Sequence, residues 1–278
     1  MNSDKNSTLF WMAKGLAVIA IVACHCCHIN EGASVLNQLS NSFMVFWMGL
    51  GVPVFYFFAG YFMNNDVNWK MFWHKKLVSI VLPWIFTGTL VWLYVVLRKG
   101  GISFQGWLGF VFLKQSYLYF LTDLFVFYIV SRLIRNENTY YIVFAILMIL
   151  CIWNSIDNLK VLESIHKYIN LNNYAYFLFG KCVGYRKWNW SNYKIGLATI
   201  CGWVVAQLLS VLDLIHSTPV ITCFGIMGMI YIASCMKETI VGSIIENWGR
   251  CSFSIYLLHM PVAGLVANVC NRTEMVAF

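Results

Sequence analysis

The residues of this chain best suited to chemistry are Lys14 and His25, which lie inside an apolar stretch at 9–28. In an α-helix, eleven residues at about 100° each bring His25 back to within about 20° of Lys14, with about 16 Å of rise between them. The two side chains therefore share one helix face. An ionisable side chain within a membrane span is costly unless it faces the bundle interior or a water-filled cavity. The pair predicts chemistry or transport inside a membrane.

The composition supports the membrane premise. Hydrophobic residues make up 60% of the chain, charged residues make up 11%, and the mean hydropathy is +0.69. These values are typical of a polytopic membrane protein and exclude an ordinary soluble domain. The net charge of +8 comes from 19 Lys and Arg residues spread over short loops between apolar runs, so we expect no nucleic-acid partner.

Apolar stretches near the roughly 20 residues needed to cross a bilayer predict an all-α transmembrane bundle of about nine spans. We expect one membrane domain over residues 1–278. The first span is too long for a signal-peptide core, so we expect no cleavage. The predicted spans are 9–28, 43–63, 78–97, 117–134, 139–154, 173–187, 195–213, 218–236 and 252–270.

The distribution of basic residues favours a cytoplasmic N-terminus. With that orientation, 12 Lys and Arg residues fall inside and 6 fall outside, with Lys14 in the span. Those inside are Lys5, Lys70, Lys75, Lys76, Arg132, Arg135, Lys181, Arg186, Lys187, Lys194, Lys237 and Arg250, and those outside are Arg98, Lys99, Lys114, Lys160, Lys167 and Arg272.

The ten cysteines are mostly single residues within spans, where they are interpreted as small packing residues. Cys24, Cys27 and His28 would share a helix face and could hold zinc. Structural zinc sites, however, usually place a turn between ligand pairs, which a continuous helix does not supply. We expect neither a metal nor a disulfide framework.

Several motifs resemble those of the membrane-bound acyltransferase 3 family. A basic residue, ten positions and a histidine (Lys14 to His25) open the first span, and an aromatic-rich segment ends in Ala59-Gly60-Tyr61. The other matching blocks are Lys75-Lys76 before Leu82-Pro83-Trp84, the stretch 118–125, Phe177-Leu178-Phe179-Gly180, and the stretch 248–259 with its Ile255-Tyr256-Leu257-Leu258-His259. Six blocks in the family's order cover nearly the whole chain.

The chain also departs from the family pattern. Lys14 stands where arginine is commoner, Ala59 replaces a serine, and Lys75 and Lys76 replace a double-arginine pattern. The resemblance implies a tenth and last helix after Phe278. The chain is therefore interpreted as C-terminally truncated relative to the family, with a nine-span variant as the alternative.

The resemblance implies transfer of an acyl group, usually acetyl, from cytoplasmic acyl-CoA to a hydroxyl of a surface-glycan sugar or its lipid-linked precursor. It also implies a bacterial cytoplasmic membrane. The CoA phosphates need cationic partners at a cytoplasmic opening. The candidates for that role are Lys14, Lys75, Lys76, Arg132 and Arg135, whose simpler interpretation is the positive-inside bias.

His25 is the first candidate for the reacting centre, because a sugar hydroxyl needs a base to remove its proton. An acyl-histidine relay would serve as well. Asp123 is predicted to orient or charge-stabilise the imidazole, and Ser252, Tyr256 and His259 are predicted to line one face of the last span. The structural alternatives are a His25 bonded to a nearby carbonyl and polar pairs that only hold helices together.

A transporter or exporter of a glycan or lipid-linked precursor is the competing function class, since it also needs a polar face through a bundle. The sequence shows no inverted repeat and no pair of broken half-helices. A non-enzymatic assembly partner is the third interpretation. The sequence predicts no particular sugar and no oligomeric state.

Overall fold

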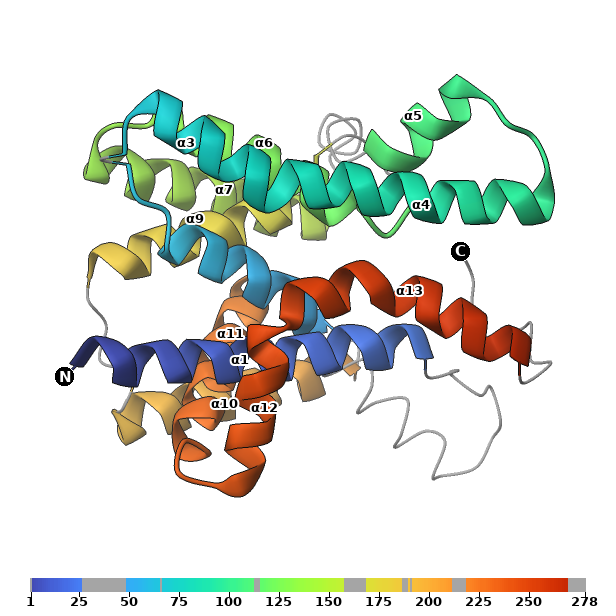
Figure 1. Cartoon of the computed structure of the whole chain (residues 1–278). Helices are drawn as coiled ribbons and strands as arrows, with labels where there is room; N and C mark the ends of the chain where they lie inside the picture. Colours follow the sequence, from blue (N-terminus) through green and yellow to red (C-terminus); the bar gives the residue numbers. More distant parts are fainter. Residues whose placement is uncertain are drawn as a thin grey trace.

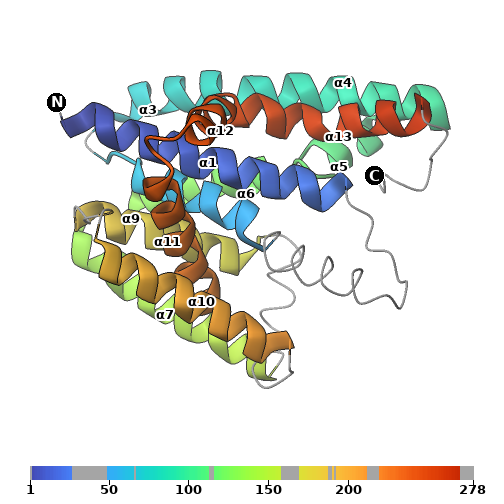
Figure 2. The ribbon, with the colours of Figure 1, turned by 90° about the horizontal axis from the view of Figure 1, so that it is seen from below.

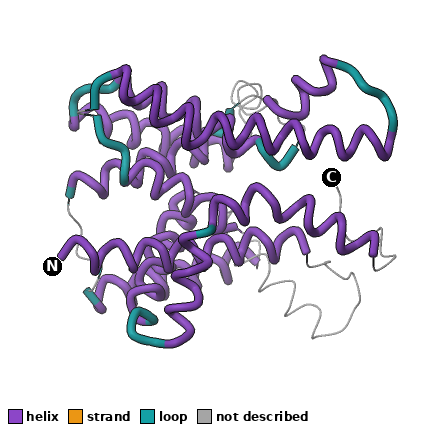
Figure 3. The backbone as a smooth tube through the Cα atoms, in the orientation of Figure 1, coloured by secondary structure: helices purple, strands orange, loops and turns teal. Residues whose placement is uncertain are grey.

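The computed structural model describes residues 2–26, 49–65, 67–112, 116–157, 169–186, 190, 192–211 and 219–269. Within these ranges every regular element is a helix and no strand occurs (Figure 3). The elements are α1 (Asn2–Cys26), a helix at Gly49–Tyr61, α3 (Trp69–Lys76), the π-helix η1 (Leu77–Val81), α4 (Leu82–Lys99), α5 (Phe104–Phe112), α6 (Tyr119–Leu133), α7 (Glu137–Asp157), α9 (Leu171–Tyr185), α10 (Tyr193–Val211), α11 (Pro219–Cys235), α12 (Ile240–Arg250) and α13 (Ser252–Val269).

The all-α class is confirmed, and each predicted span overlaps a helix of the described chain. Three of these helices are long and apolar enough to cross a membrane, at Ser7–His25, Trp69–Leu97 and Glu137–Asn154. Those at Gly49–Tyr61, Tyr193–Leu209, Pro219–Cys235 and Ser252–Val266 are apolar but shorter. The sequence prediction missed α5 and α12, because helices of 9 and 11 residues are well below a span in length.

Three of the longer helices run in the same direction along the bundle, which allows its two ends to be distinguished. Figure 1 shows α1, α4 and α13 running in the same direction, with the N-terminus at the end where α3 begins. α13 contacts both α1 and α4. Figure 2 shows α7 and α10 on the side of the bundle away from α4 and α13. As a result, the first and last described helices lie together on one side of the interior.

Two glycines bring the helix 49–61 and α9 into backbone contact. A Cβ atom on Gly60 would lie 1.9 Å from the Phe177 carbonyl oxygen, and a Cβ atom on Gly180 would lie 1.9 Å from the Phe57 carbonyl oxygen. No larger residue fits at either position without moving a helix. Small residues allow such close packing in membranes, where dispersion contacts hold helices together. These glycines belong to the motifs 59–61 and 177–180, which gives both motifs a packing role.

Pro83 accounts for the π-helix between α3 and α4. Proline has no N–H group to give to the carbonyl four residues back. The Leu82 N–H instead bonds to the Leu77 carbonyl, five residues back, which is the π-helical spacing. The helix therefore continues through the proline, and Trp69–Leu97 forms one long apolar segment.

Two cations hold the turn that leads from the helix 49–61 into α3. The Arg132 guanidinium donates to the carbonyl oxygens of Asn65 and Val67, and the Lys181 ammonium, whose residue is 6% exposed, donates to that of Met63. Carbonyls that follow a helix end have no partner within the helix, so charged donors are strong substitutes for it. This turn fixes the start of α3 and hence the basic residues that α3 carries.

Candidate active site

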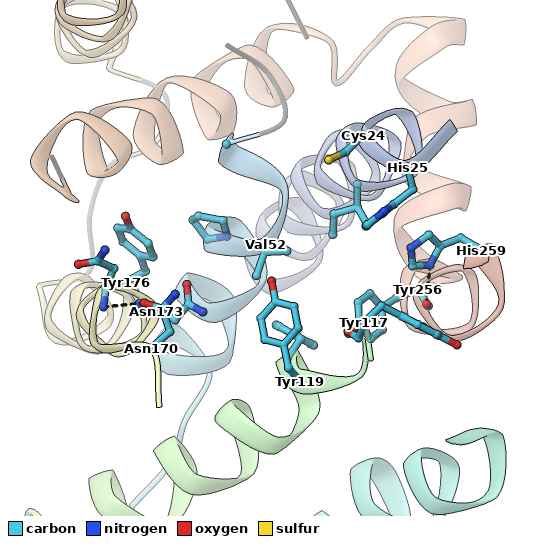
Figure 4. A pocket seen from close by; sticks show the side chains of 15 residues that line it. Cys24, His25, Val52, Tyr117, Tyr119, Asn170, Asn173, Tyr176, Tyr256 and His259 are labelled. Atoms are coloured by element: carbon cyan, nitrogen blue, oxygen red, sulfur yellow. Dashed lines mark hydrogen bonds between the residues drawn. The ribbon is translucent and has the colours of Figure 1, made fainter. Parts of the chain in front are cut away.

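A cavity of about 410 Å³ lies among α1, the helix 49–61, the start of α6, the start of α9 and α13. Two groups of polar side chains line it, as Figure 4 shows. The first group, the histidine wall, consists of His25 of α1, Tyr256 and His259 of α13, and Tyr117, which lies just before α6. The second group, the asparagine wall, lies at the start of α9 and consists of Asn170, Asn172, Asn173 and Tyr176. Tyr119 of α6 lies between them (Figure 4).

The histidine wall joins the first and last described helices. The rings of His25 and His259 lie 5.1 Å apart between centroids, with their planes at 47°. His25 is in the last turn of α1 and exposed to the cavity, whereas His259 is 7% exposed. The contact brings together two imidazoles that are more than two hundred residues apart in the chain. Two neighbouring imidazoles can exchange a proton or share the charge that forms during a reaction.

The hydrogen bond of His259 defines which of its nitrogens carries the proton. Nδ1 lies 2.7 Å from the carbonyl oxygen of Tyr256, and a carbonyl oxygen can only accept. Nδ1 is therefore the donor, and Nε2 of the neutral ring is a proton acceptor. Nε2 is buried and has no hydrogen-bond partner in the described part of the structure. A buried acceptor beside His25 can take a proton from a bound hydroxyl or hold His25 in one orientation.

The position of His259 depends on a proline within its helix. Pro261 has no N–H for the carbonyl of Leu257, four residues back. The Tyr117 hydroxyl donates to that carbonyl at 2.7 Å, and the Tyr256 hydroxyl donates to the carbonyl of Tyr117. The Tyr117 ring in turn packs edge-on against His259, at 5.3 Å between centroids. In this way the proline that weakens α13 also creates the anchor beside the imidazole.

The asparagine wall is organised by the N-terminus of α9 and by Asp123. Asn170 caps α9, with its side-chain oxygen accepting from the backbone N–H groups of Asn172 and Asn173. Asn173 donates through Nδ2 to Asp123 at 3.4 Å, and the Tyr56 hydroxyl donates to the same carboxylate oxygen at 3.5 Å. Asp123 is 1% exposed and lies behind the wall. Its hydrogen bonds with Asn173 and Tyr56 hold its carboxyl group next to the asparagines.

The basic candidates lie away from the cavity, toward the end where α3 begins. Lys14 is half-buried on an aromatic surface, with its Nζ 4.6 Å from the centroid of Trp11 and within 6 Å of Phe58 and Phe62. Lys76 lies over the ring of Tyr128, at 3.3 Å from its centroid. Lys75 and Arg135 are exposed. Arg132 is the candidate already bonded to the turn before α3.

The comparison with known families accounts for most of the chain. The acyltransferase domain of the acyltransferase 3 family matches residues 12–276. The chain belongs to the acyltransferase 3 family. The comparisons with curated proteins and with solved structures gave no match.

Membership of the acyltransferase 3 family supports an acyltransferase function, and with the apolar helices it indicates a membrane protein. The matched region includes both histidines of the cavity, Lys14 and the basic residues of α3. The acyltransferase 3 motifs identified in the sequence therefore have two kinds of role. Some hold helices together, as Gly60 and Gly180 do, and others line the cavity, as His25 and His259 do.

The structure brings together His25, Tyr256 and His259 of the predicted site, while Asp123 stands behind Asn173. Sequence reasoning missed Tyr117, Tyr119 and the asparagines at 170, 172 and 173. A usable signal was the polar stretch that ends at Asn173, in the first turn of the apolar helix α9. Two of the possible zinc ligands, Cys27 and His28, lie outside the described residues.

Proposed function

We propose that this chain transfers an acyl group, acetyl in the simplest case, from cytoplasmic acyl-CoA to a hydroxyl of a surface-glycan sugar or its lipid-linked precursor. The observation that carries the proposal is the contact of His25 with His259 at the wall of the 410 Å³ cavity. An exposed imidazole beside a buried proton acceptor suits a reaction that must remove a proton from a weakly acidic hydroxyl.

Two routes use the same residues. In direct transfer, the hydroxyl oxygen attacks the thioester carbon while His25 takes the hydroxyl proton; the C–S bond breaks, and the CoA thiolate takes that proton from the imidazolium. In the relay, a nitrogen of His25 attacks the thioester and CoA leaves as the thiolate. The sugar oxygen then attacks the acyl-imidazole, the C–N bond breaks, and Nε2 of His259 accepts the hydroxyl proton. That proton finally passes to the CoA thiolate, which leaves both imidazoles neutral.

The donor would approach from the end that carries Lys14, Lys75, Lys76 and Arg135, with the N-terminus in the cytoplasm of a bacterial cell. Exposed Lys75 and Arg135 are suited to the phosphates, and Lys14 on its aromatic surface lies about 16 Å before His25 on α1. The bonds of Arg132 to the carbonyls of Asn65 and Val67 support a positioning role for it before α3. No metal enters either route.

The test compares surface-glycan O-acetyl content, by proton NMR, in cells that lack the gene and in cells complemented with variants. We expect His25→Ala to restore no acetylation, while wild type does. The matched control is His74→Ala, since His74 is exposed on α3 and should be dispensable. Membrane levels of each variant are measured in parallel. Full acetylation with His25→Ala would contradict the proposal, and altered glycan export at constant acetyl content would indicate a transporter.

The two routes are separated with purified protein in lipid nanodiscs. In the relay, isotope-labelled CoA exchanges into acetyl-CoA without any acceptor, because the acetyl group can return from His25 to the added thiol. In direct transfer no such exchange occurs without acceptor. We expect His259→Ala to lower kcat by about 10²-fold or more, as is typical for loss of a proton acceptor. An unchanged kcat would exclude a proton-transfer role for His259.

A further inference from the structure

The wall of the cavity opposite the histidines has the chemistry of a sugar-binding surface. Asn170, Asn172 and Asn173 present three amides there, and Tyr119 and Tyr176 add phenol rings. Figure 4 shows the labelled asparagines and Tyr176 on α9, across the cavity from His25 and His259, with the Tyr119 hydroxyl between the two walls. A molecule in this cavity would touch the amides on one side and the imidazoles on the other.

The hydrogen bonds within the wall define what it can offer to a ligand. The side-chain oxygen of Asn170 is taken by the cap of α9, so this residue contributes N–H donors. Asn173 uses one N–H toward Asp123, which leaves an amide oxygen as an acceptor. The wall therefore presents both donors and acceptors, as a set of sugar hydroxyls requires, because each hydroxyl both donates and accepts.

The composition of the cavity lining selects against acidic ligands. None of the described residues that line the cavity is a lysine or an arginine, so the carboxylate of a uronic acid would find no such cation there. Behind the lining, Asp123 is buried and bonds Asn173, which adds no cation. Across the cavity, the buried and unpartnered Nε2 of His259 is an acceptor suited to a hydroxyl proton.

From this geometry we infer that Asn170, Asn172, Asn173, Tyr119 and Tyr176 form the acceptor subsite, and that it takes an uncharged sugar in preference to a uronic acid. The inference rests on the proposed function, since it identifies the substrate class of the same site. The cavity volume, about 410 Å³, lies within the range of about 300–1,000 Å³ usual for small-molecule pockets.

The test measures binding, so that it does not depend on turnover. The full chain in lipid nanodiscs is examined by saturation-transfer NMR with the methyl glycosides of glucose, galactose, mannose and N-acetylglucosamine, and with those of glucuronic and galacturonic acid. We expect the strongest saturation-transfer signal to come from one of the neutral glycosides. A uronic acid that binds best, or an absence of binding by every glycoside, would overturn the inference.

The residue test uses Asn172→Leu, which keeps the backbone N–H that Asn170 caps. We expect this variant to weaken binding of the best neutral glycoside about fivefold to tenfold, as for loss of one net hydrogen bond. Asn138→Leu is the matched control, because Asn138 is exposed in α7. Equal affinities in Asn172→Leu and wild type would contradict the subsite. The two hypotheses can fail separately. If Asn172→Leu loses sugar binding but still transfers acetyl from acetyl-CoA to His25 or water, the proposed function stands and the loss is confined to the acceptor subsite.

Discussion

Replacing Tyr117 with phenylalanine removes one oxygen atom and tests the anchor beside His259. The Tyr117 hydroxyl serves the Leu257 carbonyl that Pro261 leaves without a helical partner. The substitution keeps the ring that packs against His259. It also keeps the backbone carbonyl of Tyr117, which accepts the Tyr256 hydroxyl. The perturbation is therefore confined to one donor at one carbonyl.

The expected loss in the free energy of unfolding depends on the Leu257 carbonyl, which loses its donor. Leaving a buried acceptor unsatisfied costs about 1–3 kcal/mol in proteins, while single hydrogen bonds between membrane helices average about 0.6 kcal/mol and reach about 1.7 kcal/mol. We expect Tyr117→Phe to lower the free energy of unfolding by about 1 kcal/mol. In a Pro261→Ala background the new N–H can serve Leu257 from within α13, so the same substitution should cost close to nothing.

The assay is a double-mutant cycle on the free energy of unfolding, measured by denaturant titration in mixed micelles, with acyl transfer recorded for each variant. Equal losses on Tyr117→Phe in both backgrounds would refute the link between Pro261 and Tyr117. A loss of more than about tenfold in kcat without loss of stability would refute the assignment of the hydroxyl to anchoring alone.

Three further predictions concern packing, the donor end and the acceptor wall. Gly180→Ala should abolish folding or membrane accumulation because its Cβ would lie 1.9 Å from the Phe57 carbonyl oxygen, whereas Gly202→Ala, whose nearest contact is 3.8 Å away, should accumulate normally in immunoblots of membranes. Arg132→Gln should lower the free energy of unfolding by about 2–4 kcal/mol, because two charge-assisted bonds to carbonyl oxygens are lost. Arg135→Gln, at an exposed residue, should leave the free energy of unfolding unchanged and raise the KM for acyl-CoA. The reverse pattern would contradict both roles. Asp123→Asn should raise the acceptor KM about fivefold with little change in the acyl-CoA KM, because a charge-assisted bond to Asn173 becomes a neutral one; equal changes in both KM values would argue against this.

The longer helices were predictable because each of their apolar runs is long enough to be recognised by itself, whereas α5 and α12 are too short for that. Which helices pack against one another was not predictable, because packing in a bundle depends on surfaces that lie far apart in the sequence. Tyr256 and His259 were predicted on one face of the last span, and both are buried there. Nothing in the spacing indicated that this face meets His25, since that contact depends on α13 packing against α1.

Charged residues show a second limit of sequence reasoning. Arg132 is predicted to bind phosphates because it is basic and lies on the predicted cytoplasmic side, and this stays a prediction. The sequence did not indicate the other contacts of its guanidinium, which bonds the carbonyls of Asn65 and Val67. Lys181 has the same role at Met63. A sequence shows which residues are cationic, but it does not show which backbone carbonyls a turn leaves without hydrogen-bond partners. Such carbonyls compete with ligands for the cationic side chains.

The rigidity of α1 links the two ends of the proposed reaction. A Cβ atom on Gly15 would lie 2.1 Å from the carbonyl oxygen of Ile245, and one on Gly249 would lie 1.7 Å from that of Trp11, so α12 is in backbone contact with α1 beside Lys14. Because α1 is an uninterrupted helix from there to His25, the spacing between the cation and the imidazole is set by helix geometry alone. A donor held near Lys14 would therefore have its reactive carbon placed by a fixed length of helix, while the other partner of the reaction is held by α9 and α13. Under the proposed function, this division would let one bundle hold a charged donor at one end and an uncharged hydroxyl at the other.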